Sequence, residues 1–157
     1  MKIRWMIYAA VGILFGVLDF FFQQLVQTVN AFGLRNILIL GIWLVPAFPV
    51  ILHEARITRS RCKAGLACVI TWSAAVISYY LWMGVILAFF NRSVRPELHI
   101  SNSADPNFLL NWQQAFHYDI LGGMIEWTPI ALVGGFLVGL VVSTVYFARN
   151  KPEPHTS

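Results

Sequence analysis

"GILFGVLDFFFQQ", residues 12–24, lies within an apolar run that is long enough to cross a lipid bilayer, yet it contains a carboxylate, Asp19. A charged group in the hydrocarbon layer is costly, so we expect it to be paired, protonated or functional. The run extends over about 5–27, and a helix of about 20 apolar residues spans the hydrocarbon core. The stretch therefore predicts a membrane helix that carries an acid.

The composition of the whole chain is typical of a membrane protein. Of the 157 residues, 58% are hydrophobic and 11% are charged, whereas about 25% of residues are charged in ordinary soluble domains. Three more apolar runs follow, at about 36–54, 64–90 and 118–147. We expect an all-α integral membrane protein whose residues 1–157 form a single domain of four transmembrane helices. Pro46 and Pro49 interrupt the second run, which predicts a kinked helix.

The distribution of Lys and Arg predicts the orientation of these helices. One end of the predicted bundle has Lys2, Arg4, Arg56, Arg59, Arg61, Lys63, Arg149 and Lys151, and the other has Arg35, Arg92 and Arg95. Because cytoplasmic segments are enriched in basic residues, both termini are expected in the cytoplasm, with the chain in the plasma or inner membrane. Arg56, Arg59, Arg61 and Lys63 would anchor the loop between the second and third helices to anionic lipid. The first run is too long for the core of a signal peptide, so we expect it to be retained.

Two segments are expected outside the bilayer. The polar, turn-rich stretch from 91 to 117 predicts an extracytoplasmic loop. Its last part, about 107–117, has apolar residues at spacings of three and four, which fits either a short interfacial helix or the beginning of the fourth membrane helix. The polar tail, about 149–157, is expected to be disordered.

One face of the first helix carries small and polar residues. At 100° per residue, Gly12, Gly16, Asp19 and Gln23 fall within about 60° of one another. Small residues allow another helix to approach closely, and polar side chains can form hydrogen bonds between helices. This face is therefore expected to point into the protein.

The fourth run has an acidic face and a face of small residues. Asp119 and Glu126 share one side, and Gly135, Gly139 and Ser143 form a small-residue series on the opposite side. Four helices barely enclose a pathway, so we expect a homo-oligomer or a complex with other membrane subunits. The surfaces expected to make these contacts are Gly12 with Gly16 and the series from Gly135 to Ser143.

Asp19 and Glu126 are expected at a similar depth in the bilayer. Asp19 lies about eight residues, or roughly 12 Å, from the outer end of its helix, and Glu126 lies about as far from the start of its own. Both acids are therefore expected in the outer half of the bilayer. The same arithmetic places Trp43 near that level, with Tyr80 and Trp82 close to it. These residues, with Gln23 and Asp119, predict a site that shares a proton between carboxylates or binds a cationic amine against aromatic faces.

Other types of site find little support in the sequence. His53-Glu54 does not continue as a zinc-binding HExxH motif, because Ile57 occupies the position of the second histidine. We find no motif for a nucleophile, a phosphate loop, a metal or another cofactor, and no basic face for nucleic acid, so catalysis is not expected.

The sequence leaves two functions open. The first is a transporter or transporter subunit that handles a proton or a small, cationic solute through the acidic, aromatic-lined site. The second is a non-catalytic accessory or assembly subunit of a membrane complex, in which the buried acids serve only helix packing.

Overall fold

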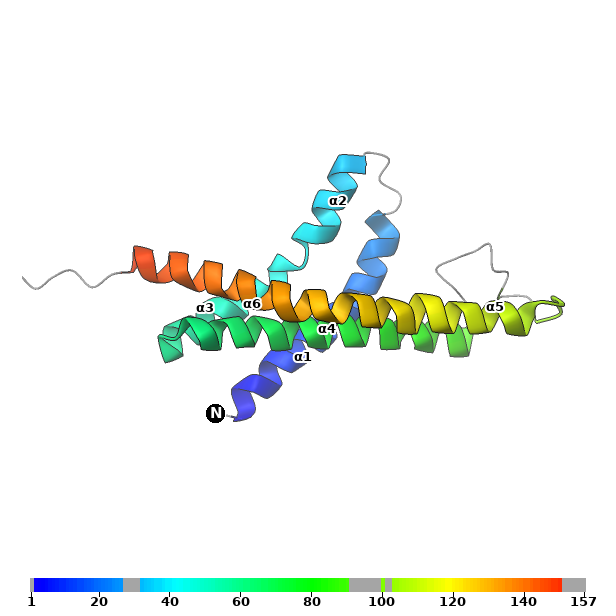
Figure 1. Ribbon diagram of the computed structural model, residues 1–157, viewed down its shortest axis with the longest axis horizontal. Helices are drawn as coiled ribbons and strands as arrows, with labels where there is room; N and C mark the ends of the chain where they lie inside the picture. Colours follow the sequence, from blue (N-terminus) through cyan, green and yellow to red (C-terminus); the bar gives the residue numbers. More distant parts are fainter. Residues whose placement is uncertain (1, 27–31, 91–99, 101–102, 151–157) are drawn as a thin grey trace, which may run out of the picture.

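The computed structural model describes residues 2–26, 32–90, 100 and 103–150, and all regular structure in these residues is helical. The elements, in chain order, are α1 (Lys2–Val26), α2 (Phe32–Gly41), α3 (Leu44–Thr58), α4 (Arg61–Phe90), α5 (Phe108–Gln114), the π-helical segment η2 (Ala115–Gly122) and α6 (Gly123–Arg149) (Figure 1). Residues 91–99 and 101–102 of the predicted loop, and residues 151–157 of the predicted tail, lie outside the described residues.

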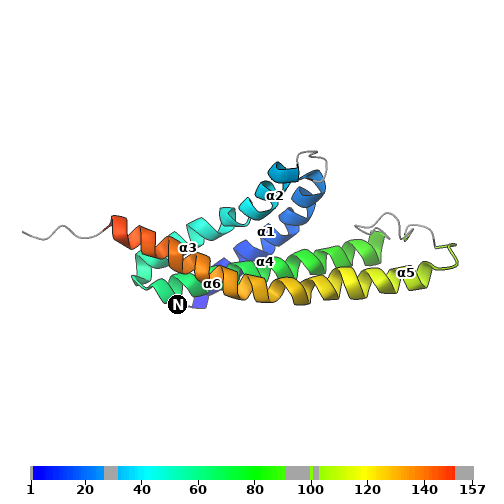
Figure 2. The ribbon, with the colours of Figure 1, turned by 45° about the horizontal axis from the view of Figure 1, so that its top comes forward.

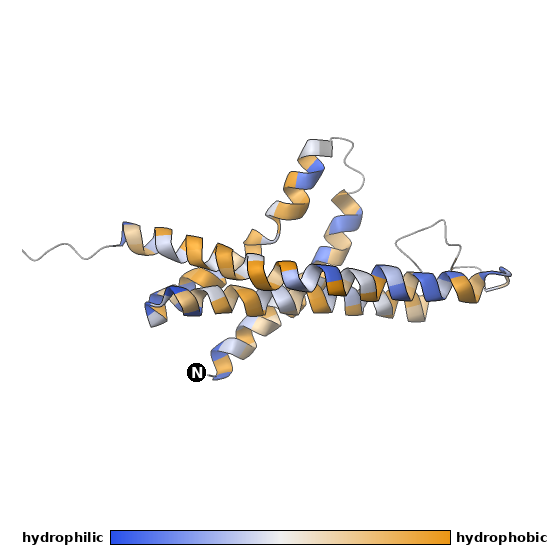
Figure 3. Cartoon of the chain, in the orientation of Figure 1, coloured by the Kyte–Doolittle hydropathy of each residue, from blue (hydrophilic) through white to orange (hydrophobic). Residues whose placement is uncertain are grey.

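Four helical spans are long and apolar enough to cross a membrane, which confirms the predicted all-α membrane fold. They are Lys2–Val26, Gly33–Thr58, Arg61–Phe90 and Phe108–Arg149. Large apolar side chains such as Leu14, Leu18 and Val133 are exposed on the outside of the helices, and hydrophobic residues recur along every long helix (Figure 3). An apolar exterior on this scale is suited to lipid rather than to water.

Helix α4 forms the centre of the packing, with its most extensive contacts to α6 and α1. Helix α6 runs alongside α4, whereas α1 crosses it obliquely and forms a hairpin with the second span (Figures 1 and 2). The beginning of α1, the turn between α3 and α4, and the end of α6 lie at the same end of the molecule. Two helical spans separate each of these three points from the next, so the chain returns to the same end each time.

The small residues that we expected at oligomer contacts are used within the chain. A Cβ atom placed at Gly12 would lie 3.0 Å from the carbonyl carbon of Thr71, and one at Gly139 would lie 2.5 Å from Cα of Gly65. Gly16 has a similar close approach to Ala75. Gly135 and Ser143 are also buried within the chain. Both small-residue faces therefore pack against α4, and neither is a free surface for a second copy.

The second span is divided at Ile42–Trp43 rather than kinked at a proline. Pro46 has no N–H to donate to the carbonyl of Ile42, and this carbonyl instead accepts a 3.0 Å hydrogen bond from the N–H of Val45. The helix axis changes direction there, and α3 begins at Leu44. The break places Trp43 between α2 and α3.

The fourth span is longer than predicted. Helices α5, η2 and α6 follow one another directly, and Phe108–Arg149 forms one helical stretch of 42 residues. The apolar spacing at 107–117 therefore belongs to the beginning of the fourth span, which was one of its two interpretations, and not to a separate helix. The π-helical turn at Ala115–Gly122 widens the helix at this point.

Candidate functional site

An aromatic cavity of about 370 Å³ lies between the two helical hairpins. Its walls come from α1, α2, α4, α6 and the break in the second span. The lining residues are Gln23, Ile39, Leu40, Trp43, Trp72, Val76, Tyr79, Tyr80, Trp127, Ile130 and Ala131. A concave apolar space with few polar groups is typical of a small-molecule site.

The aromatic rings of the cavity hold one another in place. Trp43 and Trp72 meet edge to face, with 5.9 Å between ring centroids, and the Trp72 indole N–H donates a 2.9 Å hydrogen bond to the carbonyl oxygen of Trp43. Tyr79 and Tyr80 also meet at a steep angle, with centroids 5.1 Å apart. The ring of Tyr80 lies directly against Gly123, where a Cβ atom would come within 2.6 Å of its hydroxyl oxygen. The wall is thus fixed by side chains from separate helices.

The polar edge of the cavity leads to Asp19. The Gln23 amide donates a 2.8 Å hydrogen bond to Oδ2 of Asp19, and the Tyr79 hydroxyl donates to Oε1 of Gln23 at 3.3 Å. Asp19 is only 1% exposed, and its Oδ1 has no hydrogen-bond partner within the described residues. Burying a carboxylate with one oxygen unsatisfied costs free energy. Gln23 therefore connects a destabilised acid to the cavity.

Asp19 and Glu126 do not form the hydrogen-bonded pair that their depths suggested. Asp19 is buried on the face of α1 that packs against α4, whereas Glu126 is exposed on α6. Gly16, next to Asp19, approaches Ala75 of α4, while Gly135 of α6 approaches Val69. These two positions lie on different sides of α4. Similar height in the membrane therefore does not by itself make the two acids a hydrogen-bonded pair.

The remaining predicted site residues divide into two groups. Gln23, Trp43 and Tyr80 line the cavity. Trp82 lies elsewhere, with its ring centroid 6.2 Å from that of Phe21, and Asp119 is half-buried in η2. The prediction thus found part of the cavity wall. It missed Trp72 and Tyr79, which lie seven residues apart on one face of α4, and Trp127 next to Glu126.

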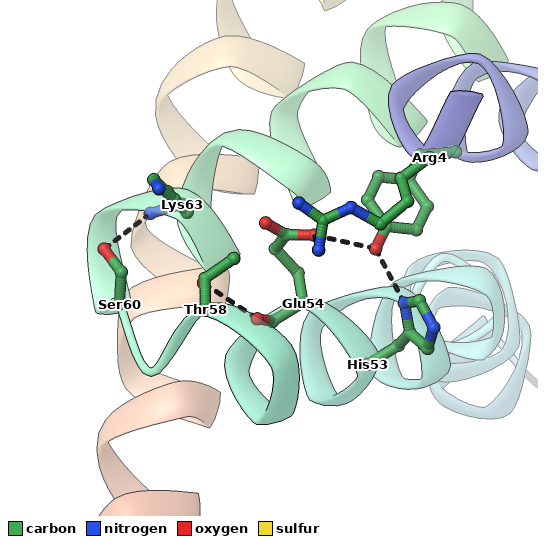
Figure 4. A network of polar contacts seen from close by, with 7 residues as sticks. Arg4, His53, Glu54, Thr58, Ser60 and Lys63 are labelled. Atoms are coloured by element: carbon green, nitrogen blue, oxygen red, sulfur yellow. Dashed lines mark hydrogen bonds and ion pairs between the residues drawn. The ribbon is translucent and has the colours of Figure 1, made fainter. Parts of the chain in front are cut away.

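A second buried acid lies at the end of the molecule that contains both termini. Glu54 is 0% exposed and accepts a 2.9 Å hydrogen bond from the hydroxyl of Tyr8. Its Oε2 atom also lies 3.5 Å from Nη1 of Arg4 (Figure 4). We had not selected Glu54 as a site residue. A signal was present, because Ala47, Ile51 and Glu54 recur at helical spacing and share the buried face of α3.

The predicted membrane anchor is exposed on the same end of the molecule. Arg56, Arg59, Arg61 and Lys63 surround the turn between α3 and α4, and all are exposed. Arg59 ends α3 in the left-handed conformation, with φ of 49°, and its backbone N–H donates to the carbonyl oxygen of Ala55. A short turn with four cations is suited to contact with anionic headgroups.

The described residues contain no group of three or more His, Cys, Asp or Glu side chains that could hold a metal ion. Searches among protein families, curated proteins and solved structures find no match to the chain. The function must therefore be inferred from the cavity and the two buried acids.

Proposed function

We propose that this chain is a multi-pass membrane protein that binds a small cationic solute in the aromatic cavity, as a transporter or a transporter subunit. One observation carries the proposal. Gln23, the residue of the described cavity wall that has a side-chain amide, is hydrogen-bonded to the buried carboxylate of Asp19. The faces of Trp and Tyr rings attract cations, by up to about 2 kcal/mol when water is excluded. A carboxylate behind the wall adds negative potential in a medium that screens charge poorly.

We further propose that both termini face the cytoplasm and that the chain resides in the plasma or inner membrane. The support is the concentration of Lys and Arg at one end of the molecule, since cytoplasmic segments carry an excess of these residues. In this orientation Gln23, one turn from the end of α1, places the cavity toward the outer half of the bilayer. Association with a second copy or with other membrane subunits would use lipid-facing surfaces other than the two glycine faces.

The proposal can be tested by ligand binding to the purified chain in lipid nanodiscs. Tryptophan fluorescence would be followed during titration with benzylammonium and with benzyl alcohol, because three of the six tryptophans of the chain line the cavity. The two probes share a ring and differ in charge. We expect benzylammonium to bind at least about tenfold more tightly, which corresponds to about 1.4 kcal/mol. Equal affinities for the two probes would contradict a cation site.

Variants assign the charge preference to one acid. Asp19→Asn is expected to remove most of the preference for benzylammonium because it neutralises the carboxylate behind Gln23. Asp105→Asn, in the turn before α5, is the matched control and should retain the preference. Glu126→Gln tests whether the exposed acid beside Trp127 contributes.

An accessory subunit is the second candidate, and one observation favours it. The chain of hydrogen bonds from Asp19 through Gln23 to Tyr79 ties α1 to α4, as expected if the acid only stabilises helix packing. In that case Asp19→Asn would lower the thermal stability or the recovery of a complex and leave probe affinities unchanged. The binding experiment therefore separates the two functions.

A further inference from the structure

A hydrogen-bonded chain of three side chains connects the surface of the molecule to the buried acid Glu54. The hydroxyl oxygen of Tyr8 lies 2.9 Å from Oε2 of Glu54 and 2.7 Å from Nδ1 of His53. His53 is exposed, whereas Glu54 is 0% exposed. The imidazole and the carboxylate are neighbours in α3, and the hydroxyl that bridges them comes from α1 (Figure 4).

Two proton arrangements satisfy this chain equally well. Tyr8 has one hydroxyl proton, so it can donate to only one neighbour. If it donates to an ionised Glu54, Nδ1 of His53 must carry a proton and donate to the hydroxyl oxygen. If it donates to Nδ1, a protonated Glu54 must donate to that oxygen instead. The arrangements differ by the transfer of one proton from His53 to Glu54.

We propose that His53, Tyr8 and Glu54 form a proton-transfer relay that loads the buried carboxylate from water at the molecular surface. His53 first takes a proton from water at Nε2 and becomes a cation. Its Nδ1–H bond then breaks as the proton bonds to the oxygen of Tyr8, and the original Tyr8 O–H proton bonds to Oε2 of Glu54. The imidazolium becomes neutral, the carboxylate becomes a neutral acid, and Tyr8 is unchanged.

The surroundings of Glu54 are compatible with both charge states. Arg4, from α1, balances the ionised state at 3.5 Å and is 25% exposed, so it can turn toward water when Glu54 is neutral. Oε1 of Glu54 has no hydrogen-bond partner in the described part of the chain, and an unsatisfied buried oxygen is costlier when it is charged. From α4, the buried Ala67 packs in one cluster with Tyr8, and Ala64 and Cys68 pack in the cluster of Ala55, the residue that follows Glu54.

The cations of α4 that lie nearest in sequence, Arg61 and Lys63, are both exposed. Lys63 lies in the first turn of α4, where its backbone N–H lies 3.4 Å from the hydroxyl oxygen of Ser60 (Figure 4). Among the described residues, the titratable and charged groups around the relay are therefore Arg4, Tyr8 and His53 close by and the exposed Arg61 and Lys63 at the beginning of α4. Cys68 of α4 and Tyr146 of α6 pack in the neighbouring cluster around Ala55. Proton loading would remove the charge that pairs α1 with α3.

The test is time-resolved infrared spectroscopy of the full chain in lipid nanodiscs after a jump from mildly alkaline to mildly acidic pH. We expect a carboxylate band to be replaced by a band of a neutral carboxylic acid, and Glu54→Gln should remove that band. Labelling glutamate with ¹³C shifts the band and assigns it to one of the four glutamates of the chain. If Glu54→Gln does not fold, the same measurement on a labelled chain in which Glu97, Glu126 and Glu153 are replaced by Gln assigns the band to Glu54, and loss of the band in that chain would contradict the relay.

The kinetics distinguish a relay from a static contact. Tyr8→Phe and His53→Gln break the chain of transferable protons, so the acid band should appear about tenfold or more slowly. Tyr118→Phe and His117→Gln, both at exposed positions in η2, are the matched controls and should keep the rate of the unaltered chain. Absence of a band that depends on Glu54, or unchanged rates in Tyr8→Phe and His53→Gln, would overturn the proposal.

Discussion

Replacing Gly16 by alanine should separate α1 from α4 and lower the stability of the protein. A Cβ atom at Gly16 would overlap the backbone carbonyl oxygen of Ala75 and the hydroxyl of Ser78, and it would lie 2.9 Å from the Ala75 carbonyl carbon. Carbon atoms of packed side chains normally approach no closer than about 3.5 Å. Because the obstacle is backbone, it cannot rotate away, and α1 must move by roughly 1 Å.

The magnitude follows from two opposing effects. Forcing one extra methyl group into a well-packed contact costs about 1–3 kcal/mol, and an obstacle made of backbone places Gly16→Ala toward the upper part of that range. Alanine also favours the helix over glycine by up to about 1 kcal/mol. We therefore expect a net loss of about 1–2 kcal/mol in the free energy of unfolding.

Gly33→Ala is the matched control because no atom lies within 4 Å of a Cβ atom placed there. It makes the same chemical change within a helix and should leave the stability equal or slightly increased. Both variants would be unfolded in mixed micelles by titration with a denaturing detergent, with helix content followed by circular dichroism. If Gly16→Ala unfolds at the same point as Gly33→Ala, the close packing of α1 on α4 is refuted.

Two further substitutions test the cavity wall. Trp72→Phe removes the donor to the Trp43 carbonyl, so thermal unfolding in nanodiscs should show a loss of about 1 kcal/mol; an unchanged midpoint would contradict a stabilising role for this bond. Gly123→Ala should push the Tyr80 ring into the cavity and weaken benzylammonium binding by about tenfold, with little change in thermal stability. Unaltered affinity in that variant would show that the ring does not shape the binding site.

Most of the fold was predictable because a helix needs about 20 apolar residues to cross the bilayer, so apolar runs of that length mark the membrane spans. The four runs became the four spans, and the largest error in position concerned the fourth, whose apolar spacing continued upstream to Phe108. The two prolines of the second run predicted a kinked helix, whereas the structure divides this span at Ile42–Trp43. A proline removes the hydrogen bond to the carbonyl four residues earlier, so Pro46 acts at Ile42 and not at its own position.

The candidate site was less predictable than the fold. The sequence predicts how deep a residue lies in the membrane, but not which neighbouring helix its side chain faces. Helical periodicity placed Asp19 and Gln23 on the buried face of α1, where they are found. Counting residues from the helix ends then placed Glu126 at the same depth as Asp19. This count does not show which side of α4 each helix occupies. Glu54 was overlooked for another reason: the four cations after it suggested a surface segment, although its spacing from Ile51 matched the buried face.

The close contact of α1 with α4 at Gly12 and Gly16 is a point about which α1 could tilt as a rigid helix. These glycines lie between Tyr8, which is hydrogen-bonded to Glu54 of α3, and Gln23, which is hydrogen-bonded to Tyr79 of α4. The two attachments are about 15 residues apart, or roughly 22 Å along the helix axis. If Tyr8 is released from Glu54, a small tilt about the glycines would swing Gln23 in the opposite direction. A chemical event at one membrane surface would thus change the shape of the cavity near the other, without any change in the conformation of the helix itself.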